Sequence, residues 1–557
     1  MTYDLVVKNA LIVDGTGNTP YSGDVAVKDG RIAAVGAVEG DATRTIDAGG
    51  QVVAPGFIDA HTHYDAQLLW DPAANPTTVH GVTTILTGNC GYTLAPVRAE
   101  DQDYLMGLFA AAEEIPKKAL ELQGPFPWAT FPEYLEFLQQ NPLGVNVVAQ
   151  IGHSALRRWV LGAECLERES TDEEIGEMVR LVEEAFDAGA SGFSSSHAPH
   201  QRGEHGEHIP SFLASEKEIY ALADAVKRKG VRLFSLNPKS KREGINQEDR
   251  DLFANLADAS GAVVSFNDFG MGAPNWEATL EFMEEQQRQG REIYAVARCQ
   301  RPETRFTLKK LSSVFAISEP WVDFSKYDPA QKVAFLSDPE WRAKLSEIWE
   351  SAKFLSMVSV EKGTTPDTEK LEGRLLTDIA EERGCTPAEV MFDTAIADGL
   401  GTFFRISGPV NVDEGPLERI LKSPATLVGI SDGGAHLQTF AGGDYTSYFL
   451  QHWVKETSRF TLEAGVAALT SEVAEFLGIQ DERGTIEVGK AADLVVFDPD
   501  TVSPLALETL EDIPGGGSRM TKQAQGMPYV IVNGEVVIDE GRSTQAVPGQ
   551  VVESARA

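Results

Sequence analysis

The sequence predicts an α/β fold: a (β/α)8 TIM-like barrel with a small β-sandwich domain formed by both chain ends. Three observations lead to this prediction. Eight short apolar strands alternate with helical stretches in the middle of the chain. Both chain ends instead alternate apolar and polar residues around glycine-containing turns. The 557 residues are also enough for one such barrel with additions.

The two chain ends are expected to contain short strands. Near the N-terminus, DLVVKNALIVDG and DVAVKDGRIAAVG contain Asp-Gly turns, and near the C-terminus MPYVIVNGEVVIDEG contains an Asn-Gly hairpin signal. Two separated β-rich ends can form one domain, and two independent caps are the alternative. We therefore expect a β-domain made of residues 1–54 and 476–557, with the barrel over 55–475.

Eight strand candidates follow one another in the predicted barrel, each ending in polar residues. They are VVAPGFIDAHTH, GVTTILTGNCG, GVNVVAQIGH, ASGFSSSH, VRLFSLNP, GAVVSFNDFG, EIYAVARCQ and TLVGISDGGAH. Helical stretches such as TDEEIGEMVRLVEEAFDAG begin with acidic residues and end in glycine, as helix capping favours. In such a barrel the chemistry lies at the C-terminal strand ends.

Two connections are longer than a barrel needs. Residues 95–142 separate the second and third strands, and residues 302–375 lie between the seventh and eighth. Loops of this length usually serve as lids or binding elements. We therefore expect insertions at both places.

Composition excludes several classes of partner. The net charge of −36 and the pI near 4.6 disfavour binding to nucleic acid or to an anionic membrane surface. No stretch approaches the ~18 apolar residues of a spanning helix, and no secretory signal is visible at the N-terminus. Four cysteines are too few for a disulfide framework in a chain of this length. We expect a cytoplasmic protein, and the sequence leaves open whether it forms a homo-oligomer.

The end of the first predicted strand carries two histidines, in Gly-Phe-Ile-Asp-Ala-His-Thr-His. In extended backbone, residues i and i+2 share a face, so His61 and His63 are expected to project together. Two imidazoles with this spacing can occupy adjacent positions on one divalent ion. The motif therefore predicts a metal site at this strand end.

Asp432 closes the eighth predicted strand in the segment Ser-Asp-Gly-Gly-Ala-His. The first and eighth strands are neighbours in a closed barrel, so Asp432 can reach a metal ion held by His61 and His63. A carboxylate there can be both a ligand and the proton acceptor for water. We therefore expect Asp432 to act as the catalytic base.

These motifs resemble a known family. PGFIDAHTH, SDGGAH and the split β-domain resemble the amidohydrolase superfamily, and TGNCG after the second strand resembles its N-acyl-D-amino-acid deacylase (D-aminoacylase) branch. The resemblance implies a zinc enzyme in which water attacks an amide carbon. It also implies that His61, His63 and Asp432 hold one zinc ion and that Cys90 is a thiolate ligand. The alternative for Cys90 is a buried, small apolar residue.

The fifth and sixth strands depart from that family pattern. D-aminoacylases carry histidine ligands at these two strand ends, whereas this chain has Asn237 and Asn267. The fourth strand also lacks the lysine that binuclear relatives carry. Because a neutral amide oxygen binds zinc more weakly than imidazole, we expect one zinc ion rather than two. His197 could supplement the site, but we expect the loop group His197, His200, His205 and His208 to be solvated.

Cationic side chains near strand ends are the candidates for substrate contacts. A deacylase of N-acyl amino acids must pair the substrate carboxylate, for which arginine has the best-matched shape. Arg298 and Lys239 follow the seventh and fifth strands, and Arg157 and Arg158 follow the third. His153 is a further candidate, able to hydrogen-bond a substrate carbonyl or to support the ligands.

The predicted function is metal-dependent hydrolysis of a linear amide in a small N-acyl substrate. An N-acyl-D-amino acid is favoured, and the D configuration rests on the family resemblance. One alternative is a hydrolase of cyclic amides, similar to hydantoinase or dihydroorotase. The other is a non-catalytic barrel that has lost its metal, which the missing fifth- and sixth-strand histidines favour and the retained His61, His63 and Asp432 oppose.

Overall fold

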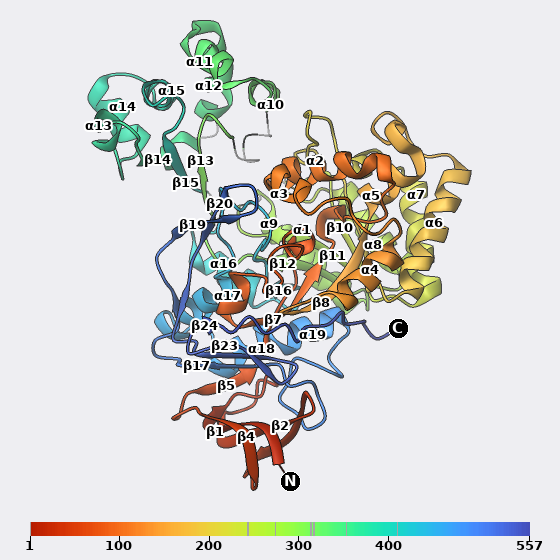
Figure 1. Cartoon of the computed structure of the whole chain (residues 1–557). Helices are drawn as coiled ribbons and strands as arrows, with labels where there is room; N and C mark the ends of the chain where they lie inside the picture. Colours follow the sequence, from red (N-terminus) through yellow and green to blue (C-terminus); the bar gives the residue numbers. More distant parts are fainter. Residues whose placement is uncertain are drawn as a thin grey trace.

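The structure is a computed structural model that describes residues 2–556, except 242–243, 273, 312–314, 316–317, 352–353 and 409. Eight parallel strands form a curved sheet at its centre (Figure 1). Each strand lies within one of the eight predicted segments. They are β6 (Phe57–Asp59), β7 (Val82–Thr87), β8 (Asn146–Gly152), β9 (Gly192–Ser196), β10 (Leu233–Asn237), β11 (Val263–Phe269), β12 (Ile293–Ala297) and β16 (Thr426–Val428).

The first and last barrel strands meet just beyond their ends. The hydrogen-bonded order is β16-β12-β11-β10-β9-β8-β7-β6, which places β6 and β16 at opposite edges of the sheet. A parallel bridge between Thr62 and Gly433 joins the segments that follow these edge strands. The backbone N–H of His63 also donates to the Gly433 carbonyl over 2.7 Å. The curled sheet therefore brings the predicted first- and eighth-strand motifs side by side.

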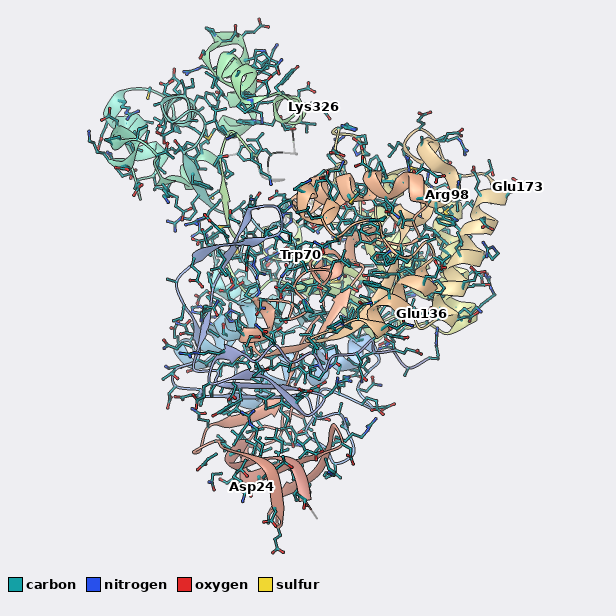
Figure 2. The ribbon with its side chains drawn as sticks, viewed as in Figure 1. Asp24, Trp70, Arg98, Glu136, Glu173 and Lys326 are labelled. Carbon is teal, nitrogen blue, oxygen red and sulfur yellow. The ribbon has the colours of Figure 1, made fainter. Side chains whose placement is uncertain are left out.

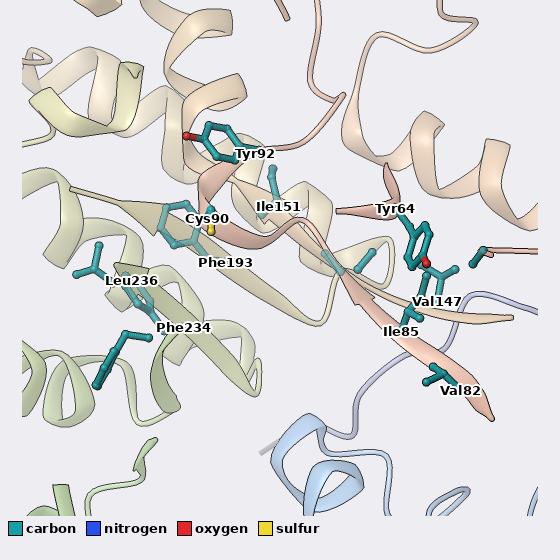
Figure 3. Packing of buried hydrophobic residues seen from close by; sticks show 14 of the residues in the cluster. Tyr64, Val82, Ile85, Cys90, Tyr92, Val147, Ile151, Phe193, Phe234 and Leu236 are labelled. Atoms are coloured by element: carbon teal, nitrogen blue, oxygen red, sulfur yellow. The ribbon is translucent and has the colours of Figure 1, made fainter. Parts of the chain in front are cut away.

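Helices cover the outside of the barrel because their apolar faces pack against strands that are themselves buried. Thr171 caps α6 in a reciprocal capping box with Glu174, and Gly230 ends α7 in the left-handed conformation, as the sequence predicted. Figure 3 shows part of the resulting core, with Phe193 and Phe234 between strands and helices. The helices around the barrel are α1 (Tyr64–Gln67), α5 (His153–Leu161), α6 (Asp172–Asp187), α7 (Glu216–Lys229), α8 (Gln247–Ser260), α9 (Trp276–Arg288), α16 (Glu414–Leu421), α17 (Tyr445–Tyr448), α18 (Leu462–Leu469) and α19 (Ser471–Leu477).

Both chain ends contribute to one nine-stranded sheet, rather than forming two separate caps. In this sheet β5, which immediately precedes the barrel, pairs with β1 on one side and with β17 on the other. Its order is β24-β23-β22-β17-β5-β1-β2-β3, with β4 also paired to β1. The strands are β1 (Thr2–Ile12), β2 (Tyr21–Lys28), β3 (Arg31–Gly36), β4 (Asp41–Asp47), β5 (Val52–Pro55), β17 (Leu494–Phe497), β22 (Tyr529–Val532), β23 (Glu535–Asp539) and β24 (Arg542–Ser543).

The insertion before the last barrel strand forms a subdomain with its own apolar core. We predicted it over 302–375, but it extends to Ser407 because β15 (Phe403–Ser407) pairs between β13 (Glu303–Phe306) and β14 (Val358–Lys362). In Figure 2, Lys326 of this subdomain and Asp24 of the terminal sheet lie at opposite ends of the molecule. Its helices are α10 (Glu319–Ser325), α11 (Pro329–Ser337), α12 (Pro339–Ser351), α13 (Pro366–Glu369), α14 (Leu376–Arg383) and α15 (Pro387–Ala397).

The insertion at 95–142 instead joins the main core. It contains α2 (Gln102–Ala112), α3 (Lys117–Glu121) and α4 (Phe131–Gln140), and α2 and α3 lie across one end of the barrel (Figure 1). Phe109 and Trp128 belong to the same buried cluster as the barrel strands. A C-terminal hairpin of β19 (Glu508–Ile513) and β20 (Gly517–Thr521), with the short pair β18 (Ser503–Pro504) and β21 (Ala524–Gln525), completes the described elements.

The four cysteines are free thiols. Among the described residues, no helix combines the length and the apolar character needed to cross a membrane.

Candidate metal centre

The segment after β6 brings the imidazole rings of His61 and His63 close together. His61 donates its backbone N–H to Asp59 Oδ1 at 3.1 Å, and Thr62 donates to the Leu86 carbonyl at 3.2 Å. These contacts, with the Gly433 bond described above, fix the backbone on both sides. As a result the Nε2 atoms of His61 and His63 lie 3.2 Å apart, and both side chains are buried.

Cys90 reaches the same point from the turn after β7. Its backbone has a φ of +57°, a conformation that is unusual for a residue with a side chain. Cys90 Sγ lies 3.8 Å from His61 Nε2, and one ligand atom each from His61, His63 and Cys90 lie within 4.8 Å of one another. Figure 3 shows Cys90 at the end of the buried strands, beside Tyr92.

Asp432 approaches from beyond β16. Its Oδ1 lies 3.2 Å from His61 Nε2, and its Oδ2 accepts a 2.7 Å hydrogen bond from Arg298 Nη2. Burial raises the pKa of this carboxyl, but His61 and Arg298 outweigh that effect and hold the pKa well below its usual range. Asp432 is therefore ionised at neutral pH, as a ligand or a proton acceptor must be.

A second carboxylate, which the sequence analysis missed, comes from the insertion at 95–142. Glu113 follows α2 directly, and its Oε2 lies 3.6 Å from His63 Nε2 and 3.9 Å from His436 Nε2. Burial raises the pKa of Glu113 to about 7. Burial lowers the pKa of His436, but Glu114 and Glu113 outweigh it and raise it to about 10. No spacing signal in the sequence links this helix end to the strand motifs.

A cavity of about 210 Å³ opens onto these groups. Its described lining includes two cations, Lys241 and Arg202, on loops after β10 and β9. Arg202 also contacts Glu319 of the insertion subdomain at 3.3 Å. The full lining is His61, His63, Cys90, Ala111, Ala112, Glu113, His200, Gln201, Arg202, Lys241, Asn267, Asp268, Ile430, Asp432 and His436.

Two predicted substrate contacts are placed elsewhere. Lys239 is exposed and is not among the described lining residues, whereas Lys241, two residues further on, is. Arg298 is buried and pairs through Nε with Asp268 at 3.0 Å and through Nη2 with Asp432 at 2.7 Å, while its Nη1 has no hydrogen-bond partner among the described residues. Neither Lys239 nor Arg298 is among the described lining residues, and their role as contacts of the substrate carboxylate stays a prediction.

His153, a predicted substrate contact or supporting residue, is engaged within the protein. Its Nδ1 lies 2.8 Å from Ser195 Oγ and its Nε2 lies 2.7 Å from Glu218 Oε1, so both ring nitrogens are occupied. Arg157 donates to the same carboxylate over 2.6 Å. These residues form a buried polar network beside the third and fourth strands.

The loop histidines after β9 differ from one another, although we predicted them as one solvated group. His197 is buried, which lowers its pKa to about 3, and its Nε2 has no hydrogen-bond partner among the described residues. His200 lines the cavity, His208 stacks on Phe212 with ring centroids 3.8 Å apart, and His205 is exposed. The prediction holds only for His205, because the loop folds back over the barrel end.

Asn237 and Asn267 stand at or near the ends of β10 and β11. The Asn237 amide donates to Cys90 Sγ over 3.3 Å, and its oxygen accepts from the Asn267 backbone N–H over 3.3 Å. Asn237 therefore uses both ends of its amide within the protein. It orients the thiol of Cys90 instead of offering an oxygen to a metal ion.

The residues at this point fit a metal ion. Neighbouring ligands of a tetrahedral ion with bonds of about 2.0–2.3 Å are about 3.3–3.7 Å apart. The observed separations of 3.2 Å for His61–His63, 3.2 Å for His61–Asp432 and 3.8 Å for His61–Cys90 are close to this range. Imidazole, thiolate and carboxylate together are the donor types that zinc prefers.

Comparison with known proteins places this site in a family. The amidohydrolase family profile matches residues 44–348 and 356–538. The chain belongs to the amidohydrolase family. This membership confirms the resemblance inferred from PGFIDAHTH and SDGGAH.

Individual amidohydrolases resemble the chain over its whole length. A D-aminoacylase from Alcaligenes xylosoxydans xylosoxydans is 29% identical over 99% of this chain and 97% of its own. A structure of D-aminoacylase with a binuclear metal centre has a TM-score of 0.67 and 27% identity, covering 99% of this chain and 100% of that one. The N-acyl-D-glutamate deacylase from Bordetella bronchiseptica, solved with zinc and a phosphonate inhibitor, has a TM-score of 0.69 and 26% identity over the full length of both chains. These relatives confirm the fold class and the predicted deacylase branch.

Proposed function

We propose that this amidohydrolase removes the acyl group from N-acyl-D-amino acids, using one divalent metal ion. The observation that carries the proposal is the convergence of His61, His63 and Cys90 within 4.8 Å of one another, with Asp432 Oδ1 3.2 Å from His61 Nε2. Full-length relatives that bear the names D-aminoacylase and N-acyl-D-glutamate deacylase support the substrate class and the D configuration.

The ligands assigned to this ion are His61, His63, Cys90 and Asp432, and the ion we favour is zinc. When bound, zinc acts as a Lewis acid towards the amide carbonyl and makes water more acidic. A second ion is disfavoured because the ends of β10 and β11 offer neutral amides, and Asn237 is engaged with Cys90 and Asn267. The small mixed-donor set therefore supports one ion.

Asp432 is the proposed general base. Its contact with Arg298 keeps the carboxylate ionised and fixes one oxygen, which leaves Oδ1 directed to the ligand cluster. In the reaction, the oxygen of water attacks the amide carbon while Asp432 accepts a proton from that water. The carbon–nitrogen bond then breaks, and the proton passes from Asp432 to the leaving amine. Arg298 acts through Asp432 and is a positioning residue.

Lys241 is the proposed partner for the substrate carboxylate. It lines the cavity together with Asp268, and Ala111, Ala112 and Ile430 supply apolar surface nearby. A lysine in a confined cavity gives a charge-assisted contact to a carboxylate. Lys241 thus takes the part that the sequence analysis gave to Lys239 and Arg298.

A chiral hydrolysis assay tests the proposal. Purified protein is loaded with zinc and offered N-acetyl derivatives of D- and L-amino acids, and the released amino acids are resolved chirally. We expect hydrolysis of D substrates and no release by the His61→Ala variant. Activity confined to cyclic amides would instead favour the hydantoinase-like alternative, and protein that binds no metal would favour the non-catalytic one.

A further inference from the structure

The end of helix α2 places a buried carboxylate beside the metal centre. Glu113 is the residue that ends this helix, and its side chain is only 4% exposed. The helix is held in place by Leu105, Leu108 and Phe109 in the main core. Glu113 is therefore delivered to the barrel mouth by a rigid element, not by a mobile side chain on the surface.

The position is electrostatically unfavourable for a carboxylate unless a cation is close. The C-terminus of a helix carries a partial negative charge, and a buried anion needs a compensating partner. The two basic groups nearest to Glu113, His63 and His436, lie 3.6 and 3.9 Å from its Oε2, both longer than a hydrogen bond. His436 is also shared with Glu114, whose Oε2 lies 3.6 Å from its Nδ1.

The separation between Glu113 and His63 instead suits two ligands of one ion. It is 3.6 Å, against 3.2 Å between His61 and His63, and both are near the spacing of about 3.3–3.7 Å expected for adjacent ligands of one zinc ion. Carboxylate oxygen is a normal zinc donor, whereas the amides at the ends of β10 and β11 are poor ones. The insertion thus supplies a carboxylate donor, whereas Asn237 and Asn267 offer only neutral amides.

We propose that Glu113 is a ligand of the metal centre, contributed from outside the barrel. The inference rests on the proposed function only in requiring a metal ion at His61 and His63. The competing role for Glu113 is that of a structural counter-ion for His436, with no contact to the metal. That role predicts that Glu113 and Glu114 are equivalent, because both carboxylates face His436.

Metal binding by Glu113→Gln, with Glu114→Gln as the matched control, separates the two roles. Each apoprotein is titrated with zinc in competition with a chromophoric chelator, and with cobalt(II) for its absorption spectrum. Loss of a ligand should exceed the 10–100-fold typical of residues that only support ligands, so we expect zinc binding to be weakened by more than about 100-fold. We also expect a changed cobalt spectrum, with Glu114→Gln within about threefold of the wild type.

Three outcomes would overturn the inference: a loss of less than about 100-fold in Glu113→Gln, an unchanged cobalt spectrum, or an equal loss in Glu114→Gln. Thermal unfolding of the apoproteins checks folding, and removal of a buried charge at a helix C-terminus should not lower the midpoint. Because these readouts use no substrate, wild-type protein that binds zinc but hydrolyses no N-acyl amino acid would refute the proposed function alone.

Discussion

Two buried histidine–carboxylate clusters lie at the same mouth of the barrel and differ in how closely their polar atoms pair with one another. The sealed cluster consists of His153, Glu218, Arg157 and Ser195, whose contacts of 2.6–2.8 Å are all of hydrogen-bond length. The open cluster consists of His61, His63, Asp432 and Glu113, separated by 3.2–3.6 Å around a cavity. Side chains that pair fully with one another hold the fold, whereas side chains that converge at longer separations around a cavity leave room for a ligand.

The largest effect is expected in the open cluster. Asp432→Asn should lower kcat/KM for an N-acyl-D-amino acid by about 10³-fold or more, because it removes the general base. The free energy of unfolding should change little, since Arg298 keeps its contact with Asp268. Steady-state kinetics and chemical unfolding measure the two effects. Asp268→Asn is the control, and its kcat/KM is expected to fall by less than tenfold. Equal losses of kcat/KM in both variants would contradict the assignment of Asp432 as the general base.

The sealed cluster is expected to show the reverse pattern. Glu218→Gln weakens the partner of a buried arginine and should destabilise the protein by about 3–5 kcal/mol, as breaking a buried ion pair does. Zinc affinity of the folded protein should stay within about threefold of the wild type, because no open-cluster residue contacts Glu218 among the described residues. Denaturant titration gives the free energy of unfolding, and metal competition gives the zinc affinity. Weaker zinc binding without destabilisation in Glu218→Gln would contradict the structural role of the sealed cluster.

Lowering the pH should destabilise the protein through the Glu218 carboxylate. Burial raises the pKa of Glu218, but His153 and Arg157 outweigh it and lower the pKa to about 2, below its usual value of about 4.3. Since the folded-state pKa is depressed, this stabilisation is complete above about pH 4.3 and is lost as the pH falls towards 2. It amounts to roughly 3 kcal/mol. Between pH 6 and pH 2, the free energy of unfolding should fall less steeply with decreasing pH in Glu218→Gln than in the wild type. Equal slopes in the two proteins would exclude Glu218 as the source of the pH dependence.

The smallest effect is expected at Lys241, one of the cations that line the cavity. Lys241→Ala should raise KM for an N-acyl amino acid by about tenfold with little change in kcat, as the loss of a ground-state contact to a carboxylate does. Lys239→Ala, two residues away on the exposed surface, is the matched control and should leave both constants unchanged. An unchanged KM in Lys241→Ala would show that another group pairs the carboxylate.

Local sequence patterns predicted the parts of the molecule that depend on neighbouring residues. Each barrel strand lies in its predicted segment, and the His-x-His spacing brought two Nε2 atoms within 3.2 Å because extended backbone alternates its side chains. The pairing of the chain ends also followed from their similar turn-rich patterns. Short motifs such as PGFIDAHTH and SDGGAH carried the resemblance to the amidohydrolase family, which the family profile confirms.

The parts that could not be predicted depend on how loops return to the barrel. Glu113 follows a helix whose Phe109 packs in the main core, and Lys241 lines the cavity whereas Lys239, two residues earlier, is exposed. The sequence also does not show that both ring nitrogens of His153 find partners while His197 is buried with its Nε2 unpaired among the described residues. Spacing fixes the relation between adjacent residues, but tertiary packing decides which side chains face a cavity.

The pairing of β5 with β17 has a consequence for how the protein is made. The strand that precedes His61 leaves the ribosome early, yet its partner near residue 495 is among the last segments synthesised. At about 5–20 residues per second, translation from His63 to Asp432 takes roughly 20–70 s. During that interval the nascent chain carries His61, His63 and Cys90 without the acidic partner from the eighth strand. Metal capture should therefore be a late event in biogenesis, and a ribosome stalled before Asp432 should hold zinc weakly.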